Sequence, residues 1–385
     1  FTVKDFRLLS GQTYELKPVV KGYGMRTMHV DVGTCTMTEK PVTGDMKKRF
    51  TGGKGFGLRL LWNGTRPTTK WNDPKNEIVI AMGPICGNTN YPGSGKSLVV
   101  SLSPMTGVPI DSNVGGYFGP FLKFGGWDAL EVQGKADVET IVFIDNVEGS
   151  IRFYEAPSGL GTDTHELADQ LTRAFAGGVG SGGGSTDPSE LQAISVVSAG
   201  RGAEHGLMGL LNFSLYDKRR DGIRVKQAGR GGIGRVLRDK KVRALVCRFR
   251  GVTQDSNDAD DPATVQRLGL KLHREIIQND DYQTKMRRIG TAHLMEVMND
   301  YDLLPTKNHK YGQDPHGPEI ASWVWEKLFS QGLPDGCWYG CTMACAHSVD
   351  HFELQTGPYR GQKVIVDGPE YETAAEIGRD PVGTP

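Results

Sequence analysis

The sequence predicts an α+β protein, with a β-rich first domain over residues 1–250 and the beginning of a mainly α-helical domain over residues 251–385. Three observations support this prediction. Before residue 250, short stretches rich in β-branched residues alternate with glycine-rich turns. Beyond residue 260, apolar residues recur at helical spacing. Between them, residues 251–261 are polar and acidic, as expected at a domain boundary.

Individual elements follow from local patterns. Strands are predicted at Met28–Val32, Glu77–Ala81, Ser97–Ser101, Ala129–Gln133, Thr140–Ile144, Ala193–Val197 and Ala244–Arg248. Helices are predicted at Phe56–Trp62, Thr164–Phe175 and Gly234–Asp239 in the first domain, and at Pro262–Asn279 and Thr284–Asn299 in the second.

Composition excludes several classes of protein. The 45 basic and 45 acidic residues balance, so no net field attracts nucleic acid or an anionic membrane. No apolar run reaches the 18 or so residues of a membrane span, and the first 30 residues lack a signal-peptide pattern. We therefore expect a cytoplasmic protein whose partners are small molecules or other proteins.

Glycine is the outlier in composition, with 52 residues. The glycines gather in blocks between the predicted strands, at 52–57, 83–95, 115–126 and 229–234. Glycine recurs where the backbone takes a positive φ or approaches a ligand closely. Such repeated blocks favour a large ligand that is held by the main chain.

Two of these blocks resemble nucleotide-binding motifs. Residues 229–234 fit the pattern G-x-G-x-x-G and follow the strand-like Ile223–Val225, which leaves open a nicotinamide-dependent dehydrogenase. However, that strand carries charge and the surrounding pattern is not βαβ. Residues 92–97 resemble a phosphate loop, but Asn90 stands where the first glycine belongs, so this match fails.

Three cysteines lie within nine residues, at Cys337, Cys341 and Cys345. If the segment is helical, residues four apart share one face, and the three sulfurs form a stripe. Three converging thiolates are typical of a metal site but are one ligand short of a zinc site or an iron-sulfur cluster. His347, a downstream segment or another subunit could complete the site. Three reduced, buried thiols remain the alternative.

The other cysteines, Cys35, Cys86 and Cys247, are isolated in short apolar stretches. A cysteine in such a place usually behaves as a small buried hydrophobic residue. We therefore expect these three to be structural rather than metal ligands.

Together, the motifs resemble the tungsten-containing aldehyde ferredoxin oxidoreductase family. They occur in order as residues 83–87, 101–107, 113–128 and 229–234, the three cysteines, and 367–372. The likeness runs from about Gly24 to Gly378 and covers roughly the first half of a usual family member. The resemblance implies that the first domain consists of two β-sheets that form the base for the cofactor.

The same resemblance implies tungsten or molybdenum held by two pyranopterin dithiolenes, beside a 4Fe-4S cluster. Residues matching Asn113 and Gly115 contact the pterin in this family, and main-chain groups at Asn113 and Gln227 hold a magnesium ion that joins the pterin phosphates. The family's pterin-contacting arginines fall at Lys96 and Lys226. Lysine keeps the charge but lacks the planar guanidinium fork. Solvated surface lysines are the alternative at both positions.

The cluster ligands implied by the resemblance are Cys337, Cys341 and Cys345. Family members usually have two residues between the first and second cysteine, whereas this chain has three. Gly340 could let a loop accommodate the extra residue. The fourth cysteine of the family lies beyond Pro385, so we expect a longer chain or another polypeptide to supply it.

Glu372 is the implied acid–base residue, since the second glutamate of the family's Glu-Tyr-Glu motif points toward the metal site. Desolvation in an apolar pocket would raise its pKa and suit proton transfer near neutral pH. The alternative is a helix N-terminus in which Asp367, Glu370 and Glu372 complement the dipole. We favour that alternative for Asp367 and Glu370, with Glu370 facing a neighbouring helix or solvent.

The implied activity is the oxidation of an aldehyde to a carboxylic acid, with electrons passing through the cluster to ferredoxin or a partner subunit. The resemblance also implies an oligomer or a multi-subunit complex. Three alternatives remain open. They are reduction of an aromatic ring in an acyl-CoA thioester, the nicotinamide-dependent dehydrogenase, and a non-catalytic cofactor-binding or electron-transfer subunit.

Overall fold

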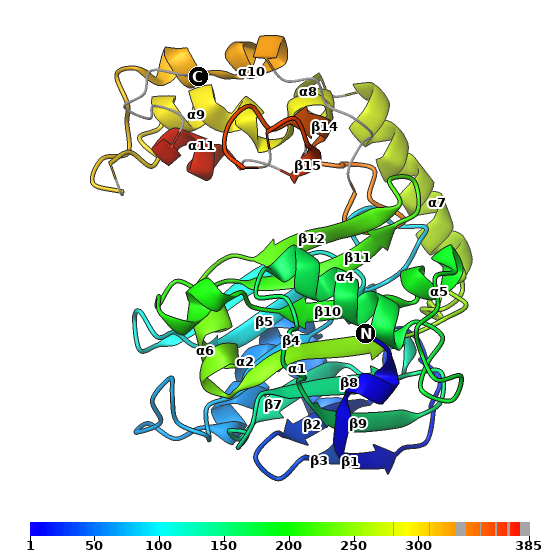
Figure 1. The fold of residues 1–385 in the computed structure, drawn as a ribbon. Helices are drawn as coiled ribbons and strands as arrows, with labels where there is room; N and C mark the ends of the chain where they lie inside the picture. Colours follow the sequence, from blue (N-terminus) through cyan, green and yellow to red (C-terminus); the bar gives the residue numbers. More distant parts are fainter. Residues whose placement is uncertain are drawn as a thin grey trace. The chain divides into compact units, whose positions relative to one another are not determined.

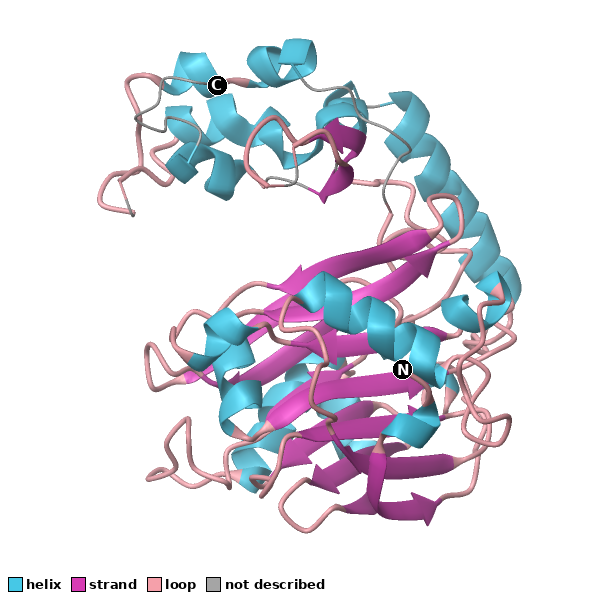
Figure 2. Ribbon diagram, viewed as in Figure 1, coloured by secondary structure: helices cyan, strands magenta, loops and turns pink. Residues whose placement is uncertain are grey.

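The computed structural model describes residues 1–279, 281–307, 309–328, 336–346, 348–358, 360–367 and 370–377. Contacts divide the chain into two compact units. The first consists of residues 1–90 and 94–265, and the second of residues 91–93 with the chain from 266 onward. Two sheets and their helices build the first unit, and short helices dominate the second, which confirms the α+β class (Figures 1 and 2).

Each sheet of the first unit is mixed. The six-stranded sheet has the order β3 (Thr36–Pro41), β2 (Arg26–Asp31), β7 (Ala129–Gln133), β4 (Ile78–Ala81), β5 (Ser97–Leu102) and β6 (Pro109–Val114). The seven-stranded sheet has the order β1 (Arg7–Thr13), β9 (Ser150–Glu155), β8 (Thr140–Asp145), β13 (Val242–Arg248), β10 (Ile194–Ser198), β11 (Leu211–Asp217) and β12 (Gly222–Ala228). β2 is parallel to β7 and β8 is parallel to β13, whereas the other neighbours are antiparallel.

One helix packs on a face of each sheet. α2 (Gly53–Gly64) packs Phe56, Leu60 and Leu61 against the six-stranded sheet, and the predicted helix at 56–62 lies within it. α4 (Thr164–Phe175) packs on the seven-stranded sheet and has the predicted bounds. The Asp163 carboxylate caps α4 by accepting from two backbone N–H groups of its first turn. Each helix therefore buries its apolar stripe on a strand surface.

A third helix joins the two sheets. α3 (Phe118–Phe124) is buried along its whole length and contacts β7 of one sheet as well as β10 and β13 of the other. The Phe118 ring makes an edge-on contact with Phe213 of β11, at 5.9 Å between ring centroids. The remaining helices of this unit are α1 (Gly44–Phe50), α5 (Pro188–Gln192) and α6 (Ile233–Asp239), with 3-10 turns at Val3–Asp5 and Arg201–Glu204.

The edge strands of the two sheets meet in pairs. On one side, the side-chain amide of Gln12 in β1 donates to the carbonyl of Met37 in β3 at 3.3 Å and accepts from its N–H at 2.5 Å. On the other side, β6 contacts β12. The Gln12 side chain thus pairs with the main-chain N–H and C=O of one edge residue, Met37, in the opposite sheet.

The second unit begins within a long helical stretch. Its elements are α7 (Pro262–Arg274), a π-helical turn (Glu275–Asn279), α8 (Asp281–Ile289), α9 (Met295–Asp300), α10 (Ser322–Leu328), the hairpin of β14 (Ser348–Glu353) with β15 (Lys363–Asp367), and α11 (Tyr371–Ile377), with 3-10 helices at Gly290–Leu294 and Gly317–Ile320. The prediction of one continuous helix over 284–299 is wrong. The buried Gly290 has a φ of +64° and separates α8 from α9.

The segment between the predicted domains packs on the first unit. Asn257 is buried, and its side-chain amide donates to the carbonyls of Pro84 at 2.8 Å and Cys86 at 3.1 Å. Its own carbonyl accepts from the N–H of Gly22 at 3.1 Å. Residues 251–265 therefore belong to the first unit by their contacts, whereas the domain boundary at residue 250 stays a prediction.

Candidate functional site

The clearest convergence of predicted site residues lies where β6 meets β12. The backbone N–H of Arg230, just after β12, donates to the hydroxyl of Ser112 in β6 at 3.1 Å. At Gly231, an added Cβ would lie 2.4 Å from the Ile110 side chain. Segments more than a hundred residues apart in sequence are therefore in direct contact at this edge.

The predicted pterin-binding residues lie in or beside these edge strands, except Lys96, which precedes β5, the neighbour of β6. Asn113 lies in β6, and Gly115 follows that strand. Lys96 and Gly115 each lie one residue beyond the last paired residues of β5 and β6. Lys226 and Gln227 lie in β12, and Lys226 pairs with Phe213 of β11. Gly116, the next residue, lies against β11, since an added Cβ there would lie 3.4 Å from Phe213.

The two predicted lysines have different surroundings. Lys96 is exposed, whereas Lys226 is only 7% exposed. Arg224 lies two residues before Lys226, on the same face of β12, and is also buried. Arg224 and Lys226 thus place two cationic side chains on one face of this edge strand. The sequence analysis did not single out Arg224, although charge within a strand-like stretch was the available signal.

Asn113 and Gln227 expose their side chains on the outermost strand of each sheet. An edge strand presents main-chain N–H and C=O groups on its unpaired side. Main-chain oxygens suit magnesium, and lysine ammonium groups suit phosphate. The donor set at this edge therefore fits a phosphate-bearing cofactor.

Most glycines of the blocks serve protein packing. Added Cβ atoms would lie 2.5 Å from the Val100 side chain at Gly57, 2.4 Å from the Phe124 ring at Gly87 and 2.1 Å from the Asn146 side chain at Gly125. Such distances exclude any side chain without a shift of the neighbour. The interpretation that all blocks grip one ligand is therefore wrong for these positions. Open space surrounds Gly83, Gly93 and Gly229, where a Cβ would meet nothing within 4 Å.

The fold contradicts the dinucleotide hypothesis for residues 229–234. A dinucleotide site of that type needs a helix that connects two parallel strands. Here α6 connects β12 to β13, which run in opposite directions with β10 and β11 between them. Gly232 also lies against the carbonyl of Leu207, 1.9 Å from an added Cβ. The glycines at 231–234 thus allow close packing of β6 and of the segment at 207–210.

The cysteine segment is not helical. Residues 336–346 form turns, bends and, at 345–346, β-bridges, with Cys337 buried and Cys341 and Cys345 half-buried. The helical sulfur stripe is therefore wrong. Within the described ranges, no three His, Cys, Asp or Glu side chains are close enough together to hold a metal ion. The described residues thus do not present a formed cluster site, and His347 lies outside them.

Two of the isolated cysteines are fully buried in the first unit. Burial raises the pKa of the Cys86 thiol to about 12 and that of Cys247 well above its ordinary value. Both thiols therefore stay protonated at neutral pH, as expected of structural residues. Cys35 is half-buried, and its pKa is also raised by burial.

Two residues that the sequence analysis missed hold the cysteine segment within the second unit. The His273 imidazole of α7 hydrogen-bonds the Thr342 hydroxyl, and the Arg287 guanidinium of α8 donates to the Thr342 carbonyl. Thr342 directly follows Cys341. The segment is thereby tied to two helices, although it contains no helix of its own.

Glu372 lies in the first turn of α11 and is half-buried. Ala374 and Ala375 of this helix are buried in the apolar core of the second unit, beside Met295 and Ile320. Glu370 precedes the helix, and its carboxylate accepts from the Thr291 hydroxyl at 2.5 Å. Glu370 therefore contacts a neighbouring helical turn, as predicted.

No helix in the described parts of the chain is both long and apolar enough to cross a membrane.

Comparisons with known proteins agree with these motifs. Residues 27–249 match the model of the aldehyde ferredoxin oxidoreductase N-terminal domain, and residues 267–381 match domains 2 and 3 of the same family. A tungsten-containing aldehyde ferredoxin oxidoreductase of Pyrococcus horikoshii is 28% identical over 362 residues, which cover 93% of this chain and 52% of the relative. The WOR-like subunit of an aliphatic sulfonate oxidoreductase of Pyrococcus furiosus is 26% identical over 370 residues, 92% of this chain and 53% of the relative.

One solved structure has a similar fold. The active-site complex BamBC of benzoyl-coenzyme A reductase, determined with 1,5-dienoyl-CoA, superimposes with a TM-score of 0.64 at 18% identity. The match covers 92% of this chain and 53% of that chain. The chain thus spans about half the length of the relatives it matches. Since the two family models together cover most of the sequence, the chain belongs to the aldehyde ferredoxin oxidoreductase family.

Proposed function

We propose that this chain forms the cofactor-binding part of a tungsten or molybdenum bis-pyranopterin oxidoreductase that oxidises an aldehyde to a carboxylic acid. Electrons would pass through a 4Fe-4S cluster to ferredoxin or a partner subunit. The observation that carries the proposal is the meeting of β6 and β12, which brings the segments of Asn113 and Gln227 together. A cofactor with two pterins needs contacts from two such segments.

The residues at this edge would bind and orient the cofactor. Main-chain groups at Asn113 and Gln227 would hold the magnesium ion between the pterin phosphates, and Gly115 would allow close approach of the backbone. Lys96 and Lys226 would balance phosphate charge. When bound, the cofactor supplies the two-electron redox chemistry, and the protein supplies position and electrostatics.

Cys337, Cys341 and Cys345 are the proposed ligands of the cluster. Thiolates are its usual protein ligands. Because the described residues do not present a formed site, the fourth ligand would come from elsewhere in the complete active unit.

Glu372 is the proposed acid–base residue. Its place in the first turn of a helix whose other face is buried fixes the carboxyl group on a rigid element. Its role would be to hold or release a proton at a carboxylate oxygen beside the substrate carbonyl.

Elemental analysis of the purified native assembly, with mass identification of every chain, tests the cofactors. We expect about four irons and one tungsten or molybdenum per active unit. An assembly that lacks iron and both of the heavier metals would refute the proposal.

The substitution Glu372→Gln tests the proton-transfer role. Turnover of an aldehyde should fall by at least about a hundredfold, while the metal content stays at the wild-type level. Glu370→Gln is the matched control because Glu370 already binds Thr291, and it should keep most of its turnover. Undiminished turnover in Glu372→Gln would remove the assignment.

The fold neighbour favours a second candidate, the reduction of an aromatic ring in an acyl-CoA thioester, because its structure contains a dienoyl-CoA. Parallel assays with an aldehyde and with an aromatic acyl-CoA separate the two reactions. Activity on the thioester alone would replace the first proposal. Metal incorporation without activity on either would instead favour a non-catalytic cofactor-binding or electron-transfer subunit.

A further inference from the structure

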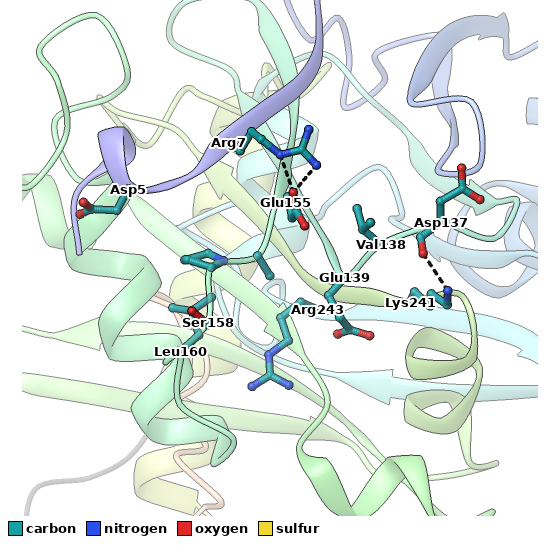
Figure 3. Close-up of a pocket in the computed structure, with 12 residues that line it drawn as sticks. Asp5, Arg7, Asp137, Val138, Glu139, Glu155, Ser158, Leu160, Lys241 and Arg243 are labelled. Carbon is teal, nitrogen blue, oxygen red and sulfur yellow. Dashed lines mark hydrogen bonds and ion pairs between the residues drawn. The ribbon is translucent and has the colours of Figure 1, made fainter.

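A separate cavity of about 810 Å³ opens at one end of the seven-stranded sheet (Figure 3). It lies where the neighbouring strands β1, β9, β8 and β13 begin or end, three strands away from β12. Its volume is within the range of small-molecule sites. Asp5 and Arg7 form one wall, and both precede residue 27, where the family's domain model begins to match.

Arg243 is placed in this cavity by an irregularity of the sheet. In the pairing of β13 with β8, Val242 pairs with Thr140 and Ala244 with Ile141, so Arg243 is an extra residue in its strand. A β-bulge of this kind redirects a side chain and often lies beside a functional site. Arg243 lines the cavity together with Leu160 and Glu139, as Figure 3 shows.

The positive charge of the Arg243 guanidinium has few compensating contacts. The residue is 9% exposed, and no carboxylate oxygen of the described residues lies within the 4 Å of an ion pair. One hydrogen bond, to the carbonyl of Gly161, uses one of its five N–H donors. Burial, followed by repulsion from Arg238, lowers the pKa of Arg243 and outweighs the opposite effect of Glu139 and Glu204. A buried cation in this state gains from an anionic partner.

Four carboxylates line the cavity, of which Asp5 accepts from the N–H of Thr2 at 2.7 Å and Asp137 points away from Arg243 (Figure 3). The other two have basic partners. Glu155 is paired with Arg7, and Glu139 with Arg238 at 2.7 Å. The Lys241 ammonium, which also lines the cavity, donates to the main-chain carbonyl of Asp137 at 2.8 Å. Arg243 and Lys241 thus remain as two cations without a carboxylate partner among the described residues.

We propose that this cavity binds a small organic oxyanion, a carboxylate or phosphate with an apolar portion, whose charged group pairs with Arg243. The planar guanidinium matches an oxyanion with two parallel hydrogen bonds. Val138, Pro157 and Leu160 supply the apolar wall. The site is distinct from the edge formed by β6 and β12, and it requires neither metal nor pterin.

Calorimetric titration of the full chain tests the site, with benzoate and inorganic phosphate as probes. We expect saturable binding of at least one probe, with a dissociation constant below about 10 mM. Benzoate binding alone indicates a carboxylate site with an apolar subsite, and binding of phosphate alone indicates a phosphate site. Binding of neither probe overturns the proposal.

The substitution Arg243→Gln should weaken binding of that probe by at least about tenfold, because charged hydrogen bonds are lost. Arg243→Lys keeps the charge but not the fork and should give an intermediate loss. Arg49→Gln is the matched control, since Arg49 is an exposed arginine paired with Asp45 in α1, and it should bind like wild type. Wild-type affinity in folded Arg243→Gln overturns the proposal.

A second substitution keeps the test decisive if Arg243→Gln fails to fold. Lys241→Gln should weaken binding of the same probe by about threefold, since it removes the second cation of the cavity. Unchanged affinity in that case overturns the proposal.

Discussion

The first unit contains two pairs of buried residues of opposite charge. One pair forms an ion pair, and the other does not. Lys123 and Asp128 are both 0% exposed and form an ion pair at 2.5 Å. Glu77 and Lys240 are 0% and 2% exposed, but no ion pair joins them in the described structure. All four side chains are almost fully buried. The difference between the two pairs therefore shows the effect of a close partner of opposite charge.

At the Lys123–Asp128 site, both charged groups pair with each other and have further hydrogen-bond partners. The Asp128 carboxylate also accepts from the backbone N–H groups of Gly24 at 3.0 Å and Met25 at 2.8 Å, and Lys123 donates to the carbonyl of Gly22 at 3.0 Å. These contacts tie the end of α3 to the segment before β2. Ions at this depth persist only when paired and hydrogen-bonded.

Glu77 and Lys240 respond to burial by shifts of their pKa values rather than by forming an ion pair. Among the described residues, neither Glu77 oxygen has a hydrogen-bond partner, and His29 approaches only to 3.8 Å. Burial, followed by repulsion from Glu131, raises the pKa of Glu77 to about 8. Burial lowers the pKa of Lys240, whose ammonium donates to the carbonyl of Gly134, to about 8. Without a close partner, a buried group thus shifts toward its neutral form.

The largest expected effect comes from breaking the satisfied pair. Lys123→Met should lower the free energy of unfolding by about 3 to 5 kcal/mol, because Asp128 is left as an uncompensated buried charge. Urea unfolding measures the loss. The double variant Lys123→Met with Asp128→Asn should recover part of it, and a single-variant loss below about 1 kcal/mol would contradict the role of the pair.

The next effect is the pH dependence of Glu77. Between pH 4.5 and about 8 the unfolded chain has lost the proton that folded Glu77 keeps, so stability falls as pH rises. Glu77→Gln should remove this slope and be more stable than wild type at pH 8, by on the order of 3 kcal/mol. Urea titrations at pH 5, 6.5 and 8 measure the slope.

Glu39→Gln is the control for that slope. The Lys17 and Arg26 side chains outweigh burial and lower the pKa of Glu39, so its contribution is lost only in more acidic solution. A Glu77→Gln variant that keeps the wild-type slope would show that Glu77 is ionised in the folded state.

A smaller effect of opposite sign is expected for Lys240. Between about pH 8 and 10.5 the unfolded chain binds the proton that folded Lys240 has lost, so stability rises with pH. Lys240→Met should reduce this rise by on the order of 2 kcal/mol, measured as the difference from wild type between pH 8 and 10. Lys135→Met, at a partly exposed lysine paired with Asp239, should keep it.

The smallest effect is expected at His29. Its contact with Glu77 is long and depends on protonation of the imidazole, so His29→Gln should change the free energy of unfolding by less than about 0.5 kcal/mol at pH 8. A loss above about 2 kcal/mol would show that His29 is the missing partner of Glu77, and the contrast with Asp128 would fail.

The central strands of both sheets could be predicted, whereas most of the outer ones were missed; the strand-like Ile223–Val225 lies within the edge strand β12. β2, β7, β4 and β5, and β8, β13 and β10, are runs of buried β-branched residues and match the predicted strands closely. β1, β3 and β6 were not predicted because edge strands are half exposed and carry polar residues such as Gln12 and Asp111. β9 and β11, the next strands inward, were also missed.

The residues of the candidate site could likewise be predicted only in part. The resemblance named Asn113, Lys226 and Gln227, but no local pattern could show that β6 and β12 lie side by side. Arg224, His273 and Arg287 were missed because their significance comes from contacts across the fold. The conditional prediction of a helical sulfur stripe at Cys337–Cys345 was wrong because spacing alone cannot distinguish a helical turn from a loop.

The sequence by itself determined the α+β class, the central strands, α4 and the family's ordered motifs. These depend on local hydrophobic periodicity and residue identity, which are present in the chain before it folds. The tertiary structure alone decided how the edge strands meet, which glycines admit protein neighbours, and whether a buried acid such as Asp128 or Glu77 finds a base. Those outcomes depend on which distant segments come into contact, and therefore on packing rather than on pattern.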